Sequence, residues 1–493
     1  MSLDPDTCYR ALSARDTRFD GVFFVGVTTT GVYCRPVCRA RRPGADRCRY
    51  FTTPAAAEQE GFRPCLRCRP ELAPGRAIVD ATGRLAAAAA ARIAAGALNG
   101  RGVDALAAEL HVGERQLRRA LAREFGVGPL ELAQTHRLLL AKRLLTDSAL
   151  PVTQVAFASG FRSIRRFNAL FRERYRLNPT ALRRTRAEAE AAEGTLALTL
   201  AYRPPLAWGA LLAYLAGRAT PGVEAVEGDR YLRTVALDGC RGWIAVEPAR
   251  GADALRVRVS LGLAPVLMPL LARLKSLFDL DAEPEPIAAH LSADSALAPR
   301  VRREPGLRVP GCVDGFELAM RAVLGQQVSV RAATTLAGRI ATAFGEPLET
   351  GHPALTRSPV SAEHMAAVEP EELAALGLTR ARAATVVALA RAVAEDGVRL
   401  EPGADVERTM ERLRAIPGIG EWTAQYVAMR ALHWPDAFPH GDLGLRKAWG
   451  GASAARLRAD AERWRPWRAY AALYLWTFGA APSAPSHTLE EAQ

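Results

Sequence analysis

Ile416-Pro417-Gly418-Ile419-Gly420-Glu421-Trp422-Thr423-Ala424 is the stretch of the chain that says most about its fold. Its two glycines permit a tight turn between two helices and the close approach of a phosphate group. The backbone amides at the start of the second helix can donate hydrogen bonds to that phosphate. A turn of this kind occurs in many proteins that bind nucleic acids, and alone it does not predict catalysis. The segment Phe438-Pro439-His440-Gly441-Asp442 follows it and adds a carboxylate. Together the two segments predict a helix-hairpin-helix unit with an acidic residue beside it.

Hydrophobic periodicity divides the rest of the chain into regions of different structure. From about Pro310 to Gly479 the pattern is helical and is interrupted by Pro and Gly. The region before it alternates apolar and polar residues, which predicts a small antiparallel sheet with one helix. The predicted strands are Thr195–Tyr202, Thr234–Leu237 and Leu255–Leu261, and the predicted helix is Trp208–Ala219. Residues 76–182 are predicted to be helical, and 184–194 is predicted to be a linker because it is charged and lacks apolar periodicity.

The composition is that of a globular protein with several domains. A chain of 493 residues is long enough for about three or four of them. No segment approaches the roughly 18–20 apolar residues of a membrane span, and Met1–Phe19 lacks the apolar core of a signal peptide. We therefore expect a cytoplasmic protein without a membrane partner. The net charge of +13 lies in the first 190 residues and is carried almost entirely by arginine. Solubility and codon bias would explain it, and so would a nucleic-acid partner for this part of the chain.

Two cysteine pairs predict a metal site near the N-terminus. Cys34 and Cys38 form one pair, Cys65 and Cys68 form the other, and a proline lies beside each. Such short spacing lets two thiolates of one loop face the same ion, and two pairs complete a tetrahedron around one zinc ion. The alternative is that these are unrelated buried thiols. The remaining cysteines lack this pairing and are expected to serve only in packing: Cys8, Cys48, Cys240 and Cys312.

The residues around this site resemble the N-terminal domain of the Ada adaptive-response proteins. The resemblance rests on Thr29-Thr30-Gly31-Val32-Tyr33-Cys34-Arg35-Pro36-Val37-Cys38-Arg39-Ala40-Arg41 and on Gly61-Phe62-Arg63-Pro64-Cys65. It implies that Cys34 is both a zinc ligand and the irreversible acceptor of a methyl group from a methyl phosphotriester in DNA. Zinc keeps such a thiol ionised, and the thiolate is the nucleophile. Methylation then removes a negative charge beside DNA. The resemblance also implies DNA contacts by Thr30 and Arg41. The alternative is a zinc site that only stabilises the fold.

Two similar segments predict a pair of helix-turn-helix units. Each has a short helix, a turn and a longer helix: Val103–Leu110 and Glu114–Gly126 in the first, and Val152–Ala158 and Ser163–Tyr175 in the second. In both longer helices Leu or Phe recurs every fourth residue and arginines occupy the other face. The duplication resembles the AraC/XylS DNA-binding domain. The resemblance implies DNA contacts by exposed arginines, whose alternative role is simple solvation: Arg115, Arg118, Arg119, Arg165 and Arg166. The Pro-Cys-His-Arg motif of a second Ada methyltransferase is absent from the sequence, so direct repair of alkyl-guanine is not expected.

Residues 195–480 resemble 3-methyladenine DNA glycosylase II, the AlkA type of helix-hairpin-helix DNA glycosylase. The resemblance rests on the two segments quoted first and on Pro305–Phe316, Arg321–Val330 and Pro466–Trp476. It implies that a damaged base is flipped out of the duplex and stacks as a cation on Trp422, Tyr426 and Trp476. It also implies that Asp442 stabilises the developing oxocarbenium ion or orients water. The alternatives are a helix N-cap role for Asp442 and a core-packing role for the tryptophans.

Three differences from relatives refine this interpretation. Trp422 stands where strand-cleaving relatives carry a Schiff-base lysine, so no lyase activity is expected. Gln327 stands where the AlkA type often has the leucine wedge that fills the gap left by the flipped base, so this gap filling is expected to be polar. Gly418 and Gly420 would contact the DNA backbone. No cysteine follows Cys312, so no iron–sulfur cluster is expected.

The sequence thus predicts a mainly α multidomain protein with small α+β parts. The predicted domains are residues 1–76 (four-cysteine zinc module), 77–183 (double helix-turn-helix), 195–284 (small α+β domain) and 285–482 (all-α helix-hairpin-helix domain), with a tail at 483–493. The predicted function joins a methylation-sensing transcription activator to a monofunctional DNA glycosylase. The predicted partners are alkylated DNA, promoter DNA and RNA polymerase. The main alternative is a DNA-binding regulator whose glycosylase half is inactive.

Overall fold

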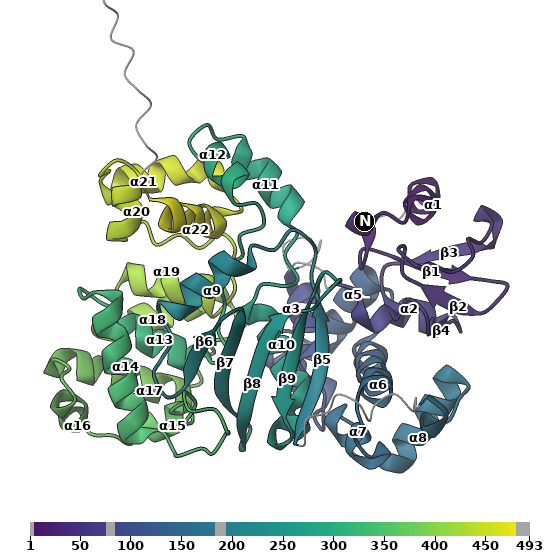
Figure 1. Ribbon diagram of the computed structural model, residues 1–493, viewed down its shortest axis with the longest axis horizontal. Coiled ribbons are helices and arrows are strands. Elements are labelled where there is room, and N and C mark those ends of the chain that lie inside the picture. The colour runs from purple at the N-terminus through teal and green to yellow at the C-terminus, as the bar shows by residue number, and fades with distance from the viewer. Residues whose placement is uncertain (1–3, 75–83, 183–193, 480–493) are drawn as a thin grey trace, which may run out of the picture.

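The computed structural model describes residues 4–74, 84–182 and 194–479. Within these residues the molecule is mostly helical, as the sequence predicts, and has two small sheets, of which the sequence predicted the second. In Figure 1 the N-terminal module and helices α5 to α8 lie on the right, the larger sheet lies at the centre, and the C-terminal helices lie on the left. Within the described residues, no helix has both the length and the apolar character that a membrane span requires. The predicted tail, and the predicted linker apart from Gly194, lie outside the described residues.

The N-terminal module is built on a four-stranded sheet in the order β3-β1-β2-β4. β1 pairs antiparallel with β2 and β3, while the short β4 pairs parallel with β2. This parallel pairing sets the end of β2, where Cys34 lies, beside the end of β4, which Cys65 follows. The bounds are Pro5–Ala14 (α1), Phe24–Val27 (β1), Val32–Cys34 (β2), Cys48–Phe51 (β3), Pro54–Gln59 (α2) and Arg63–Pro64 (β4).

The next region contains the two predicted helix-turn-helix units, and its helices confirm the sequence pattern. Leu117, Leu121 and Phe125 on α5 are buried, as are Phe167 and Phe171 on α8, so each longer helix buries the predicted stripe. The long helix α6 connects the two units. The bounds are Arg84–Ala94 (α3), Val103–Glu109 (α4), Glu114–Phe125 (α5), Pro129–Asp147 (α6), Val152–Ala158 (α7) and Ile164–Tyr175 (α8).

The second sheet has five antiparallel strands in the order β5-β9-β8-β7-β6. The three predicted strands and the predicted helix are present, and β6 and β8 are additional. β8 was not predicted because its sequence has a continuous apolar run, typical of a central strand, rather than an alternation. The bounds are Thr195–Ala201 (β5), Trp208–Ala216 (α9), Glu224–Glu227 (β6), Arg230–Leu237 (β7), Cys240–Pro248 (β8) and Ala254–Ser260 (β9).

The C-terminal region is helical, and its core is formed by side chains from α11 to α22. The predicted hairpin joins α18 to α19, and the loop that follows α19 leads to Asp442 at the start of α20. The bounds are Leu267–Leu277 (α10), Pro284–Ser292 (α11), Ala298–Arg303 (α12), Gly315–Leu324 (α13), Val330–Phe344 (α14), Ala362–Ala366 (α15), Pro370–Ala375 (α16), Arg380–Ala394 (α17), Val406–Arg414 (α18), Glu421–Arg430 (α19), Leu443–Ala448 (α20), Ala454–Asp460 (α21) and Arg468–Phe478 (α22).

The N-terminal and C-terminal halves are in direct contact. Apolar side chains of α6, α7 and α8 share one hydrophobic core with the five-stranded sheet and α10. An ion pair also joins Glu109 on α4 to Arg399 in the loop before α18, with 2.8 Å between Nη2 and Oε1. A second ion pair joins Arg92 on α3 to Glu401. The contact between the halves therefore combines an apolar core with ion pairs.

Candidate functional site

Asp442 is the N-cap of α20 and is also held by two tryptophans. Its Oδ1 accepts hydrogen bonds from the backbone N–H of Leu445 and from Nε1 of Trp476, each at 2.9 Å. Its Oδ2 accepts a hydrogen bond from Nε1 of Trp422 at 3.0 Å. An N–H group bonds only to a lone pair, so all three contacts orient the carboxylate as an acceptor. The N-cap role that the sequence left as an alternative is real, and it occurs together with the contacts to both tryptophans.

The three aromatic residues named from the sequence lie together around this carboxylate. Trp422 and Tyr426 are one turn apart on α19 and stack, with ring centroids 5.4 Å apart and an interplanar angle of 15°. Trp476 on α22 meets Tyr426 edge-on at 6.3 Å. All three are only partly buried, so their rings form an accessible wall rather than a closed core. Such a wall can stack a flat, cationic ring.

A buried arginine contacts Tyr426 and changes the pKa of its hydroxyl. Arg430 Nη1 donates to the Tyr426 hydroxyl at 2.7 Å, and the hydroxyl of Tyr214 on α9 lies 3.3 Å from that of Tyr426. Burial alone would raise the pKa of Tyr426, but the charges of Arg430 and Arg218 and the hydrogen bonds outweigh it and lower the pKa to about 8. Burial raises the pKa of Tyr214 to about 12. Sequence reasoning did not find Tyr214 or Arg430, because no local pattern links them to Tyr426.

The hairpin and the loop before α14 lie against each other. Gly418 has φ +88°, and a Cβ there would lie 2.2 Å from Oγ1 of Thr385, so the turn requires glycine at this position. The side chain of Gln326 donates to the carbonyl of Gly418 and to Oγ1 of Thr423. The next residue, Gln327, is exposed and has a left-handed backbone, with φ +57°. The exposed Val328 follows it, so this loop presents a polar and an apolar side chain beside the hairpin.

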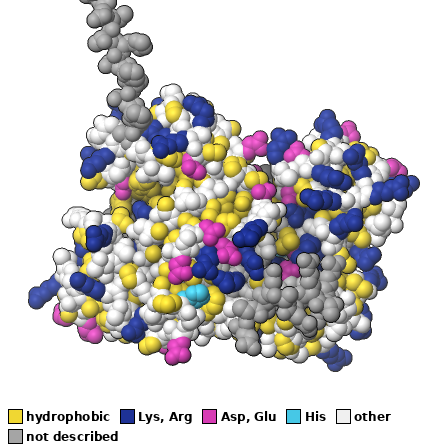
Figure 2. All heavy atoms as spheres, in the orientation of Figure 1, with side chains coloured by type: hydrophobic (Ala, Val, Ile, Leu, Met, Phe, Trp, Pro, Cys, Tyr) yellow, Lys and Arg dark blue, Asp and Glu magenta, His cyan; other side chains and the backbone are white. Residues whose placement is uncertain are grey.

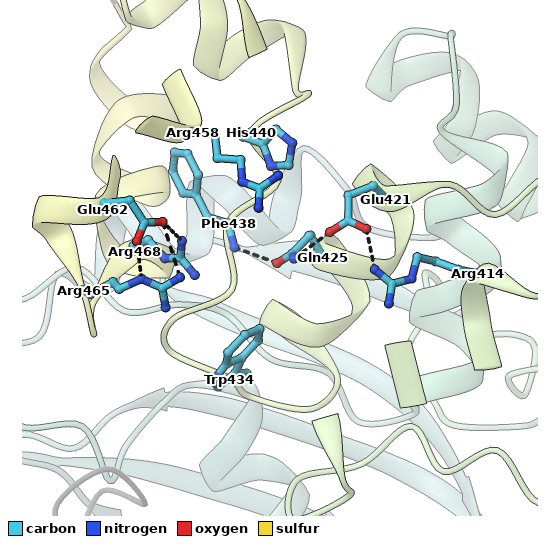
Figure 3. A pocket seen from close by; sticks show the side chains of 10 residues that line it. All are labelled: Arg414, Glu421, Gln425, Trp434, Phe438, His440, Arg458, Glu462, Arg465 and Arg468. Carbon is cyan, nitrogen blue, oxygen red and sulfur yellow. Dashed lines mark hydrogen bonds and ion pairs between the residues drawn. The ribbon is translucent and has the colours of Figure 1, made fainter. Parts of the chain in front are cut away.

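A cavity of about 380 Å³ lies beside α19, next to the loop that carries Asp442 (Figure 3). Arg468 and Arg465 bond to Glu462 on one side of it, and Arg414 bonds to Glu421 on the other (Figure 3). Gln425 Oε1 accepts the backbone N–H of Phe438 at 2.9 Å, which ties this loop to α19. Arg458 and His440 also line the cavity. The cavity therefore has a lining rich in arginine next to the hairpin.

The four predicted cysteines come together in the N-terminal module. The sulfurs of Cys34, Cys38, Cys65 and Cys68 all lie within 4.8 Å of one another, and three of these residues are buried. The neighbouring cysteines and then burial raise the pKa of the Cys34 thiol, because several thiolates cannot share so small a volume without a cation. Four sulfurs at this separation form the donor set that zinc prefers. The cluster fits one zinc ion.

A backbone amide also bonds to one sulfur of the cluster. The sulfur of Cys68 accepts the N–H of Arg35 at 3.3 Å. The neighbouring Cys34 does most to lower the pKa of Cys38 and of Cys65, and a backbone N–H group adds to the effect on each. The main influences on the pKa of Cys34 are the other three cysteines and burial.

The residues named as DNA contacts of the N-terminal half all lie at the surface. Thr30 and Arg41 are exposed on the loops on either side of the first cysteine pair. The five arginines of α5 and α8 are also exposed: Arg115, Arg118, Arg119, Arg165 and Arg166. Among them Arg118 forms an ion pair with Glu114 one turn earlier. Figure 2 shows Lys and Arg side chains gathered over the N-terminal module on the face in view.

Comparison with protein families assigns each of the four parts of the chain. Residues 7–71 match the metal binding domain of Ada, and residues 106–185 match a helix-turn-helix domain. Residues 197–314 match the AlkA N-terminal domain, and residues 320–463 match the HhH-GPD superfamily of base excision DNA repair proteins. The chain is also 44% identical over 485 residues to the "Probable bifunctional transcriptional activator/DNA repair enzyme AlkA" of Mycobacterium tuberculosis (strain CDC 1551 / Oshkosh), covering 97% of each protein. The chain belongs to the bifunctional AlkA family.

Other relatives of this bifunctional AlkA-family chain match its C-terminal half. The DNA-3-methyladenine glycosylase 2 of Escherichia coli (strain K12) is 38% identical over 278 residues, which covers 56% of this chain and 96% of that protein. The solved structure of the 3-methyladenine DNA-glycosylase from Archaeoglobus fulgidus aligns with a TM-score of 0.50 at 23% identity, covering 57% of this chain and 98% of that one. The similarity to the Archaeoglobus fulgidus structure shows a shared fold. The chain thus combines a metal-binding Ada domain, a DNA-binding helix-turn-helix domain and a DNA-repair glycosylase domain.

Proposed function

We propose that the C-terminal half is a monofunctional DNA glycosylase that releases 3-methyladenine and related cationic bases. The observation that supports this most strongly is the pair of indole N–H groups on the carboxylate of Asp442, beside a stacked aromatic wall. A base alkylated on a ring nitrogen carries positive charge and stacks on the electron-rich rings of Trp422 and Tyr426. The neutral base does not gain this attraction, so the wall discriminates by charge.

The proposed reaction is hydrolysis of the N-glycosidic bond. The bond between the sugar C1′ and the ring nitrogen breaks, the electron pair leaves with the base, and water adds at C1′. As the bond breaks, positive charge moves from the base to the sugar, where the fixed carboxylate of Asp442 stabilises it. The tryptophans hold that carboxylate in place before the substrate arrives. Trp422 provides no amine for a Schiff base, so the sugar–phosphate strand stays intact.

The test of this half is base release from methylated duplex DNA by the wild type and by Asp442→Asn. The Asn side chain can still cap α20 through its oxygen, so the fold is retained while the charge is lost. We expect the wild type to release 3-methyladenine and leave unbroken abasic strands. We expect the variant to be slower by about 10²–10³-fold, a loss typical of one electrostatic group. Equal rates would show that Asp442 has no part in the reaction.

We propose that the N-terminal half senses methyl phosphotriesters through Cys34. Zinc, when bound, keeps the cluster in the thiolate form at neutral pH. The sulfur of Cys34 attacks the methyl carbon, the carbon–oxygen bond breaks, and a phosphodiester anion leaves. The cluster loses one negative charge, so the exposed Thr30 and Arg41 meet the DNA backbone with less repulsion. The methylated module then strengthens promoter binding by the arginines of α5 and α8, and the bound protein activates transcription through RNA polymerase.

The test of the sensor is the mass of its cysteine peptides after incubation with methylated duplex DNA. We expect one methyl group, on Cys34, and none in Cys34→Ser. Zinc content measured on both proteins separates loss of the nucleophile from loss of the module. A wild type that keeps its zinc and gains no methyl group would leave the cluster with a structural role only.

A further inference from the structure

A buried ion pair connects the cysteine cluster to helix α6. Lys142 on α6 lies 2.6 Å through Nζ from Oε2 of Glu71, and the two side chains are only 1% and 2% exposed. Glu71 lies in the short helix Pro70–Leu72, which begins two residues after Cys68. Lys142 Nζ also donates to the backbone carbonyl of Cys65 at 3.4 Å. One ammonium group therefore holds the loop that supplies two of the four sulfurs.

A second cation extends this contact to the end of α6. Arg69 Nε donates to Oε1 of Glu71 at 3.0 Å, and its Nη2 donates to Oδ2 of Asp147 at 2.7 Å. The backbone of Arg69 is in the left-handed region, with φ +54°. We call these four residues the sensor lock: Arg69, Glu71, Lys142 and Asp147. Its two basic side chains form ion pairs with its two acidic side chains.

The other cysteine pair is also connected to α6. Glu58 on α2 accepts hydrogen bonds from the hydroxyls of Tyr33 at 3.0 Å and of Thr135 on α6 at 2.9 Å. Tyr33 directly precedes Cys34 in β2. Both cysteine pairs are therefore connected to one helix.

Helix α6 is also the helix that positions the DNA-reading arginines. It connects the two helix-turn-helix units and packs against α3, α5 and α7. The cysteine cluster and the recognition helices α5 and α8 thus lie on a common support. A buried ion pair is often no more stabilising than an apolar pair of the same size. What it adds is one defined orientation, because its charges tolerate no other arrangement.

We infer that the sensor lock couples methylation of Cys34 to DNA binding by the helix-turn-helix units. This inference rests on the proposed sensing function of Cys34. When the module and both recognition helices are held in one orientation, they meet the same duplex in one binding event. The gain in phosphate contact at the module is then added to the affinity of the whole domain. With the lock removed, the loop that carries Cys65 and Cys68 is no longer fixed to α6, although Glu58 still bonds to Thr135, and most of this gain is lost.

The test compares the effect of methylation on DNA affinity in three proteins. The double variant Lys142→Met, Glu71→Gln removes both buried charges and leaves side chains of similar size. The control Lys275→Met removes a more exposed lysine ion pair, the one with Asp281. The probe is a duplex selected by the methylated wild type from a random library. Zinc content and methyl uptake at Cys34 are measured for each protein.

We expect methylation to tighten binding by about tenfold or more in the wild type and in Lys275→Met. We expect less than about twofold tightening in the double variant, with normal methyl uptake and unchanged affinity before methylation. A full methylation effect in the double variant would overturn the inference. Absence of methyl uptake by the wild type would instead refute the sensing function itself, and the lock with it.

A single variant at the edge of the lock provides a second test in case the double variant misfolds. Asp147 is 21% exposed, so Asp147→Asn removes one partner of Arg69 without burying a new charge. We expect it to retain zinc and methyl uptake and to show a methylation effect between those of the wild type and the double variant. A methylation effect equal to that of the wild type would contradict the inference.

Discussion

Replacing Trp422 with Phe removes one hydrogen bond from the carboxylate of Asp442 and leaves the aromatic wall. The lost bond is the 3.0 Å contact from Nε1 to Oδ2, and a phenyl ring can still stack on Tyr426. A hydrogen bond to a charged group contributes about 1.5–3 kcal/mol. If this energy orients the carboxylate for the reaction, the rate of base release falls by about 10- to 150-fold, since each 1.36 kcal/mol is a factor of ten.

The assay is single-turnover base release from methylated duplex DNA at saturating protein, with DNA affinity measured separately. The matched control is Trp434→Phe, since Trp434 is a tryptophan that lines the neighbouring cavity. The loss at Trp422 should also disappear when Asp442 is already Asn, because the bond has then lost its charged partner. A rate for Trp422→Phe equal to that of Trp434→Phe would refute this reasoning. So would a full additional loss in the Asp442→Asn background.

Three further changes test other parts of the site. Gln327→Leu should tighten binding to abasic duplex by about 2- to 10-fold, because an apolar side chain fills the gap better; weaker binding would mean that the polar group is needed. Tyr426→Phe should remove a stabilisation of the wild type that is fully present above pH 10 and is lost as the pH falls through about 8, since the folded state lowers the pKa of Tyr426. Unfolding free energies of both proteins at pH 7 and 9.5 measure it, and an equal difference at both pH values would contradict it. Arg458→Gln should lower the slope of DNA affinity against salt concentration by about one phosphate contact. The control Arg456→Gln should leave this slope unchanged, because Arg456 is already paired with Asp460. Equal slopes for the two variants would show that Arg458 does not contact the DNA.

The sequence was sufficient where chemistry depends on local spacing. The cysteine pairs predict their cluster because each pair is short, and the parallel contact of β2 and β4 then brings the pairs together. The two helix-turn-helix units follow the same logic, since one face of α5 and of α8 repeats every fourth residue. In these regions the elements that form the site are adjacent in the chain.

Spacing was not sufficient where the site is assembled from distant elements. Resemblance to a family, and not spacing, predicted that Asp442, Trp422 and Trp476 share one site. The hydrogen bonds among them were not predicted. Tyr214 belongs to the sheet domain and reaches Tyr426 only through packing of α9 against α19. Long-range contacts of this kind leave no periodic signal in either segment.

Buried charge was the other feature that the sequence did not reveal. Lys142 stands on a helix that carries other charged residues and would be assigned to its solvated face. Helix α6 is buried on nearly every side, however, because it lies between the cysteine module and the five-stranded sheet. The ion pairs of α3 and α4 with the loop before α18 were not predicted either, because their partners lie far apart in the sequence.

The central claim is that one chain both accepts a methyl group at Cys34 and releases methylated bases. The most direct measurement is mass spectrometry of a single reaction of the zinc-loaded wild type with methylated duplex DNA. We predict one added methyl group on the peptide that contains Cys34, and free 3-methyladenine in the same sample. An unmodified peptide together with no released base, from protein that is folded and bound to the DNA, would contradict the account.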